Sequence, residues 1–152
     1  MRLSPRFAHQ SYSTTSGRSR RLNFQQLLGH PHYNRRNEFG KTIESLEERV
    51  KVEPNNPEAL FTISTYYWDR AQRNLVLTES DKRATISRGL DAVERALALN
   101  PDYFEALIYK GRLLMLQADI EPDAQKRAAL TAEVRQLNER AENIKKMRVV
   151  SR

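Results

Sequence analysis

Asn56-Pro57-Glu58-Ala59-Leu60 returns later in the chain as Pro101-Asp102-Tyr103-Phe104-Glu105-Ala106-Leu107, and the two Glu-Ala-Leu triplets are 47 residues apart. Each copy opens a helical pattern. Self-similarity at a period of a few tens of residues is typical of a solenoid, in which each helix pair needs its neighbours to cover its apolar face. The repeated stretch therefore predicts an all-α solenoid and favours a binding function over catalysis.

Apolar residues recur at intervals of three and four along the chain after Lys41, which is the spacing of one helix face. Two of these patterns end at turns that contain proline, at Pro54 to Pro57 and at Pro101, because proline removes a backbone donor and disfavours helix in the residue before it. No segment shows the apolar–polar alternation of a strand. We therefore predict no sheet and about five helices, over 41–52, 57–73, 79–99, 102–118 and 123–147.

Two of the predicted helix starts carry capping residues. Asn56 is placed as an N-cap, with Pro57 at the first helical position. Thr78-Glu79-Ser80-Asp81 has the spacing of a capping box, with aspartate in place of the usual glutamate or glutamine. Small residues are predicted to let neighbouring helices approach closely, and they are Ser64, Gly89, Ala96 and Gly111. Replacing Gly111 with a bulky residue is expected to overpack the contact between its helix and the next one.

The chain divides into a basic N-terminal arm and a neutral helical body. Residues 1–37 contain seven arginines, no lysine and no acid, whereas the rest of the chain carries the other 19 basic side chains and all 19 acidic ones. Residues 1–40 show no sustained periodicity, and we predict that they are mostly disordered because they cannot bury enough apolar surface to offset their ordering entropy. Residues 41–147 form the predicted repeat domain, and 148–152 form a tail.

The arm can be interpreted as a plain disordered extension or as the result of a translation start assigned too far upstream, and other interpretations stay open beside these two. Its arginine-rich, acid-free composition is typical of a mitochondrial presequence, and it also suits contact with nucleic acid or anionic lipid. A secretory signal and a membrane span are disfavoured because every apolar stretch is too short. We expect a soluble, cytoplasmic protein, with a mitochondrial location as the alternative if residues 1–40 act as a presequence.

The sequence offers little material for a catalytic or metal site. It has no cysteine, and its three histidines all lie in the arm, where His30 and His32 have no carboxylate nearby. Gly-rich phosphate loops and the common hydrolase motifs are absent. We therefore predict that the protein is not an enzyme and has no cofactor, no metal site and no small-molecule substrate.

The helical body resembles the tetratricopeptide repeat (TPR), a helix-turn-helix of about 34 residues. Counted on this template, the stretch from Pro57 to Gly89 is about 13 residues too long. With this extension, the Tyr66-Tyr67-Trp68 motif and the Leu99-Asn100-Pro101-Asp102-Tyr103 turn, the chain resembles extended-repeat bacterial TPR proteins. The resemblance covers about residues 41–147. The positions that match the first helix of the repeat are Leu60, Ile63, Ser64 and Tyr67, and those that match the second are Gly89, Val93, Ala96 and Pro101.

The resemblance implies an adaptor or scaffold that binds a peptide or helix of a partner protein. In TPR proteins the first helix of each pair lines a concave groove, where aromatic residues can act as anchors and an arginine can pair with a carboxylate. Some TPR proteins bind the C-terminal carboxylate of chaperones through a lysine and an asparagine. Phe61 and Thr65 occupy those two positions here, so we do not predict binding of chaperone C-termini. The groove positions in this chain are Phe61, Thr65, Trp68, Tyr109, Arg112 and Met115.

Two alternatives accompany this interpretation. Phe61 and Trp68 would instead be structural if they pack against a neighbouring helix. A hypothesis of another class makes the arm the active part, as a targeting signal or a polyanion contact, and leaves the repeats to serve assembly. Homo-oligomer formation through an uncovered end of the repeat array stays open in either case.

Overall fold

Five helices make up most of the described part of the chain, which is residues 36–150 of a computed structural model, with side chains from Glu38 onward. All of these residues belong to one unit, 32–152. The described residues contain no strand, so the predicted all-α fold of about five helices is confirmed there. The helices are α2 (Arg36–Val52), α3 (Pro57–Arg73), α4 (Glu79–Leu99), α5 (Phe104–Asp119) and α6 (Ala124–Val150).

Local capping determines where α3 and α4 begin. The Asn56 side chain accepts a hydrogen bond of 3.0 Å from the Glu58 amide, and Pro57 occupies the first turn of α3. Thr78 Oγ1 accepts a bond of 3.1 Å from the Asp81 amide and donates one of 2.7 Å to the Asp81 carboxylate. Both caps are therefore confirmed, and α3 and α4 have the predicted bounds.

The outer ends of the helical body differ from the predicted ones. α2 begins at Arg36, so the predicted boundary at residue 40 falls inside a helix. The reason is tertiary, because Phe39 is buried and its ring packs edge-on against Tyr67, with ring centres 5.4 Å apart. α6 continues to Val150, so the first residues of the predicted tail are helical. The predictions for residues 1–35 lie outside the described residues.

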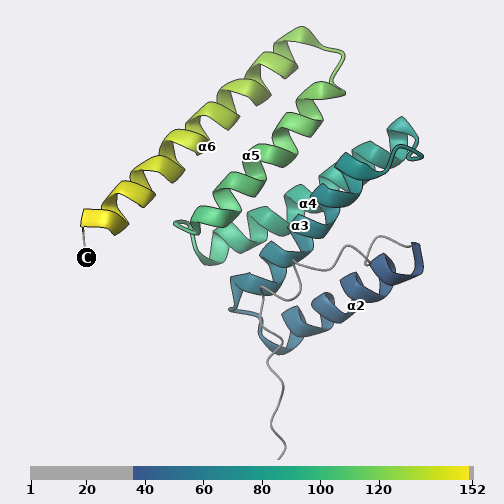
Figure 1. Ribbon diagram of the computed structural model, residues 1–152, viewed down its shortest axis with the longest axis horizontal. Coiled ribbons are helices and arrows are strands. Elements are labelled where there is room, and N and C mark those ends of the chain that lie inside the picture. The colour runs from purple at the N-terminus through teal and green to yellow at the C-terminus, as the bar shows by residue number, and fades with distance from the viewer. Residues whose placement is uncertain (1–35, 151–152) are drawn as a thin grey trace, which may run out of the picture. The chain divides into compact units, whose positions relative to one another are not determined.

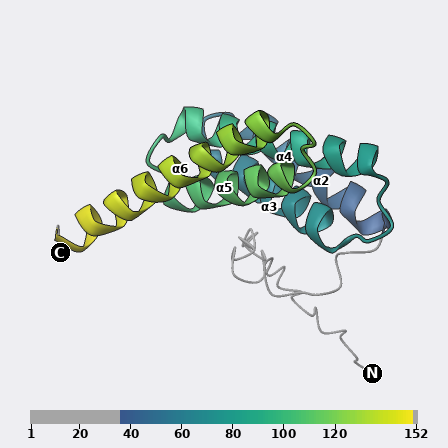
Figure 2. The ribbon, with the colours of Figure 1, turned by 90° about the horizontal axis from the view of Figure 1, so that it is seen from above.

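The helices pack mainly on their neighbours in the chain. The most extensive contacts join α3 to α4 and α5 to α6, and α3 also touches α5. Figure 1 shows α5 and α6 running side by side in opposite directions, with α2 against the other side of the α3–α4 pair. In Figure 2, seen from above, the C-terminal part of α6 projects beyond α5. The predicted antiparallel pairs are present, and their first helices, α3 and α5, are neighbours.

The apolar stripes meet at these helix contacts. One buried cluster joins α2, α3 and α4, and another joins α5 and α6. Burial of this apolar surface is the main favourable term in folding. Of the described helices, none combines the length and apolar character that a bilayer crossing requires. The buried members of the two clusters are Phe39, Ile43, Leu46, Ile63, Tyr67 and Ala92, and then Leu107, Ala141 and Ile144.

One cation ties three helices together. Lys110 lies on α5, and its Nζ is 3.1 Å from a Glu94 oxygen of α4 and 3.0 Å from a Glu133 oxygen of α6. Burial lowers the pKa of Lys110, but the hydrogen bonds to Glu133 and Glu94, together with the negative charges of these two residues, outweigh that effect and raise the pKa above its ordinary value. The lysine therefore remains charged within the helix seam.

The two glycines at helix seams are not equivalent. A Cβ atom on Gly89 would lie 2.9 Å from Leu113 Cδ2 and 3.1 Å from Tyr67 Cβ, which is closer than normal contact. A Cβ atom on Gly111 would lie 3.7 Å from Asn138 Oδ1, an ordinary van der Waals distance. The tight seam is therefore at Gly89, whereas an alanine fits at Gly111 and only a larger residue would have to displace its neighbours.

Candidate partner-binding surface

Four aromatic residues form a continuous line across α3, α5 and the turn before α5. The Phe61 ring centre is 5.0 Å from that of Tyr103 and 5.4 Å from that of Tyr109. The Trp68 ring centre lies 5.5 Å from that of Tyr109, with an interplanar angle of 80°. Edge-to-face contacts at such distances stabilise aromatic pairs. We call Tyr103, Phe61, Tyr109 and Trp68 the aromatic line; it exists because α3 and α5 are adjacent.

Arg112 lies at one end of the aromatic line. Its guanidinium carbon is 4.7 Å from the centre of the Tyr109 ring and 5.2 Å from that of Trp68. A cation within about 6 Å of an aromatic face is attracted by the electron density of the ring. Because the two rings are nearly perpendicular, together they restrict the position of the Arg112 side chain.

Two of the residues predicted for the binding groove present little surface. Phe61 is only 3% exposed, because its ring is packed between Tyr103 and Tyr109. Thr65 is 6% exposed, and its hydroxyl donates a hydrogen bond of 2.7 Å to the Thr62 carbonyl. For Phe61 the structural alternative is therefore the correct one, and the expectation that Phe61 and Thr65 line an accessible groove is wrong.

The other four predicted residues reach the surface. Trp68 and Tyr109 are half-buried, Arg112 is exposed, and Met115 is 43% exposed. We define these four residues as the α3/α5 surface. Sequence reasoning missed Tyr103 as part of the cluster beneath them; its place directly before α5 was visible, but its contact with Phe61 of α3 was not.

Tyr103 is also the most perturbed titrating group at this place. Burial raises the pKa of its phenol to about 12, and the carboxylates of Glu105 and Glu58 act in the same direction. The neutral phenol is thus the form that suits the folded state. A raised pKa means that the stability linked to this group is fully present below pH 10 and is lost as the pH rises through about 12.

Tyr103→Phe should therefore change how stability depends on pH. We expect the free energy of unfolding of the wild-type protein to fall more steeply between pH 8 and pH 11 than that of the variant, because phenylalanine has no proton to lose. Urea titrations of both proteins at the two pH values, followed by circular dichroism, measure this difference. Parallel pH profiles would show that Tyr103 does not titrate differently in the folded and unfolded states.

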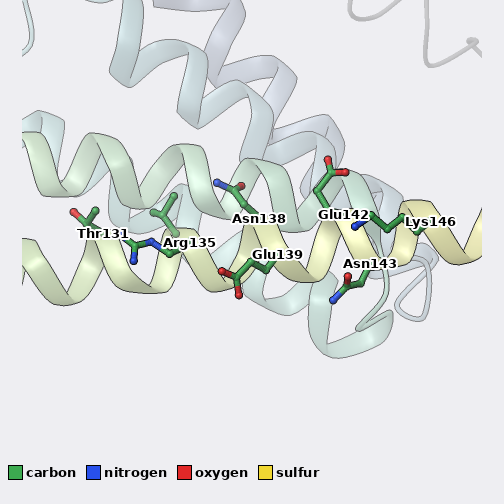
Figure 3. Close-up of a pocket in the computed structure, with 8 residues that line it drawn as sticks. Thr131, Arg135, Asn138, Glu139, Glu142, Asn143 and Lys146 are labelled. Atoms are coloured by element: carbon green, nitrogen blue, oxygen red, sulfur yellow. The ribbon is translucent and has the colours of Figure 1, made fainter.

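A second candidate is a shallow hollow of about 610 Å³ along α6. Figure 3 shows its side chains following one stretch of this helix, with Asn138 on the side toward α5. Two basic and two acidic residues line it, and Val134 is its one apolar member. The charged residues are Arg135, Glu139, Glu142 and Lys146.

Two more hollows involve α3. One of about 790 Å³ lies between α2, α3 and α4, where its apolar floor of Leu60, Ile63 and Tyr67 is buried and its rim carries both charge signs. The other, of about 440 Å³, lies beside the turn after α3, where Leu75 and Val76 are exposed. In neither hollow is an aromatic residue accessible in the way that Trp68 and Tyr109 are.

Residues 36–150 contain no group of three or more His, Asp or Glu side chains that could bind a metal ion together. Comparisons with protein-family models, curated proteins and solved structures find no match for this chain. Its function is therefore inferred from its own residues.

Proposed function

We propose that this chain is an adaptor that binds a peptide or helix of a partner protein on the α3/α5 surface. The observation that carries the proposal is the ordered set of half-buried Trp68 and Tyr109 beside exposed Arg112 and Met115. Anchors that are held in place before binding lose little conformational entropy on association. The resemblance of the helical body to TPR proteins supports the proposal, because in those proteins the first helix of each pair, here α3 and α5, lines the binding groove.

The composition of the α3/α5 surface favours it over the hollows. Aromatic residues, methionine and arginine are enriched in protein interfaces, whereas other charged residues are depleted from interface cores. Trp68, Tyr109, Arg112 and Met115 match that description. The α6 hollow, with four charged residues and one apolar residue, does not.

The single tryptophan of the chain allows a direct test, because Trp68 lies within the proposed surface. Peptides selected from a display library on the full-length protein should shift Trp68 emission. Tyr109→Ala should weaken their binding about tenfold or more, as expected for an aromatic anchor that a bound partner covers. Isothermal titration calorimetry and fluorescence titration of the same peptides give the affinities.

Arg135→Gln on α6 is the matched control, since it alters an exposed residue in another hollow and should leave the affinity unchanged. The folded state of each variant is checked by circular dichroism and urea unfolding. Selected peptides that leave Trp68 emission unchanged, and that bind the wild type and Tyr109→Ala equally, would contradict the proposal.

Deletion of residues 1–35 separates this proposal from an active role of the arm. Peptide affinity should survive the deletion if the α3/α5 surface is the binding site. Loss of binding in the deleted protein, together with a steep dependence on salt in the full chain, would instead indicate the arm, because phosphate-type contacts weaken strongly with ionic strength.

A further inference from the structure

Arg112 carries a charge that no carboxylate of residues 38–150 neutralises through an ion pair. Both acidic residues of α3 already form ion pairs with other arginines: Asp69 with Arg73 at 2.6 Å, and Glu58 with Arg49 at 3.0 Å. Lys110, two residues before Arg112, shows the contrasting arrangement, since two glutamates hold it. The cation at the α3/α5 surface is therefore available to a ligand.

The geometry of Arg112 suits a carboxylate. The faces of Tyr109 and Trp68 hold its guanidinium by cation–π contacts, so the side chain is partly ordered before a ligand arrives. Its N–H groups make no hydrogen bond to the described residues, and the residue is exposed. A guanidinium offers a planar fork of donors that matches the two oxygens of a carboxylate.

Apolar surface lies on both sides of this cation along α5. Tyr109 is three residues before Arg112 and Met115 is three residues after it, a spacing that places all three on one helix face. A bound segment that continues past Arg112 in either direction therefore meets an apolar side chain. This arrangement fits an acidic side chain within a segment better than a free carboxyl terminus, which would leave one side uncovered.

We propose that Arg112 selects partner segments in which an aspartate or glutamate is flanked on both sides by large apolar residues. This inference rests on the adaptor function proposed above and adds the chemistry of the partner. Tyr109 and Met115 contact the apolar residues, and Arg112 binds the acid between them.

The test is peptide selection from a random display library on three full-length proteins: the wild type, Arg112→Gln and the matched control Arg135→Gln. The wild type and the control should enrich Asp or Glu between large apolar residues. Arg112→Gln should keep the apolar preference and lose the acidic one. For a selected peptide synthesised with Asp or with Asn at that position, the wild type should prefer the acid about tenfold or more, and Arg112→Gln should show nearly equal affinities.

Two further measurements sharpen the result. Arg112→Lys keeps the charge but lacks the planar fork of donors. Its preference for the Asp peptide over the Asn peptide should therefore lie between those of the wild type and Arg112→Gln. Amidation of the peptide carboxyl terminus should leave the affinity unchanged, and a loss on amidation would overturn the assignment to an internal side chain.

The outcomes separate this inference from the adaptor function. Failure of the wild type to enrich any peptide that shifts Trp68 emission would overturn both. Enriched peptides that shift Trp68 emission without an acidic preference, or with one that persists in Arg112→Gln, would leave the adaptor function standing and overturn the role of Arg112.

Discussion

Leu113→Ala is expected to lower the free energy of unfolding by about 2–5 kcal/mol, the usual cost of emptying a fully buried leucine site. Leu113 has no exposed surface, and its methyl groups fill the space left by Gly89 of α4. The surrounding helices cannot close that space without moving their backbones, so a cavity remains. Urea unfolding of the variant, monitored by circular dichroism, measures the loss.

Leu99→Ala is the control for Leu113→Ala, because it makes the same chemical change at a leucine that is 41% exposed. It should cost less than about 1 kcal/mol, as surface substitutions usually do. Equal losses at the two positions would show that the seam around Leu113 is not tightly packed in solution.

Gly89→Ala is expected to destabilise the protein by about 1–3 kcal/mol through overpacking. Alanine favours helix over glycine by about 1 kcal/mol, so helix propensity alone would predict the opposite sign. The new Cβ would meet Leu113 Cδ2 at 2.9 Å and Tyr67 Cβ at 3.1 Å. The leucine methyls are enclosed and the tyrosine Cβ is fixed to α3, so neither atom can yield freely. Urea unfolding of this variant shows whether the substitution lowers or raises the free energy of unfolding.

Gly111→Ala is the matched control for the substitution at Gly89. Its Cβ would meet neighbours only at 3.7 Å and beyond, so the gain in helix propensity should dominate and raise stability by about 0.5–1 kcal/mol. If both alanine variants are stabilised, the close approach of α3, α4 and α5 at Gly89 is not as described.

The double variant Gly89→Ala/Leu113→Ala tests the cause of the clash. Shortening Leu113 removes the methyl groups that the new Cβ would meet, so the two losses should sum to more than the measured loss of the double variant. A coupling of about 1 kcal/mol is within the usual range for residues in contact. Additive losses would instead assign the cost of Gly89→Ala to Tyr67.

The bounds of α3 and α4 could be predicted because their signals are local. Asn56 and Thr78 bond to amides two and three residues away, so the residues that start each helix are neighbours in the sequence. The start of α2 could not be predicted in this way. It depends on Phe39 packing against Tyr67, 28 positions later in the chain.

The candidate site was only partly predictable for the same reason. Helical spacing and the resemblance to TPR proteins indicated one face of α3 and one face of α5, and Trp68, Tyr109, Arg112 and Met115 do reach the surface. The burial of Phe61 depends on rings contributed by α5 and the turn before it. Spacing along α3 contains no information about those rings.

The amino-acid sequence by itself determined that the body of this protein is helical, where its proline turns fall and which apolar stripes are available for packing, because each of these depends on residues within a few positions of one another. Only the tertiary structure decided that Gly89 is tight while Gly111 has room, that Leu113 is enclosed, and that Arg112 lies beside two rings from different helices. Those properties depend on the distance between helix surfaces, which arises when side chains from three helices fill the same space.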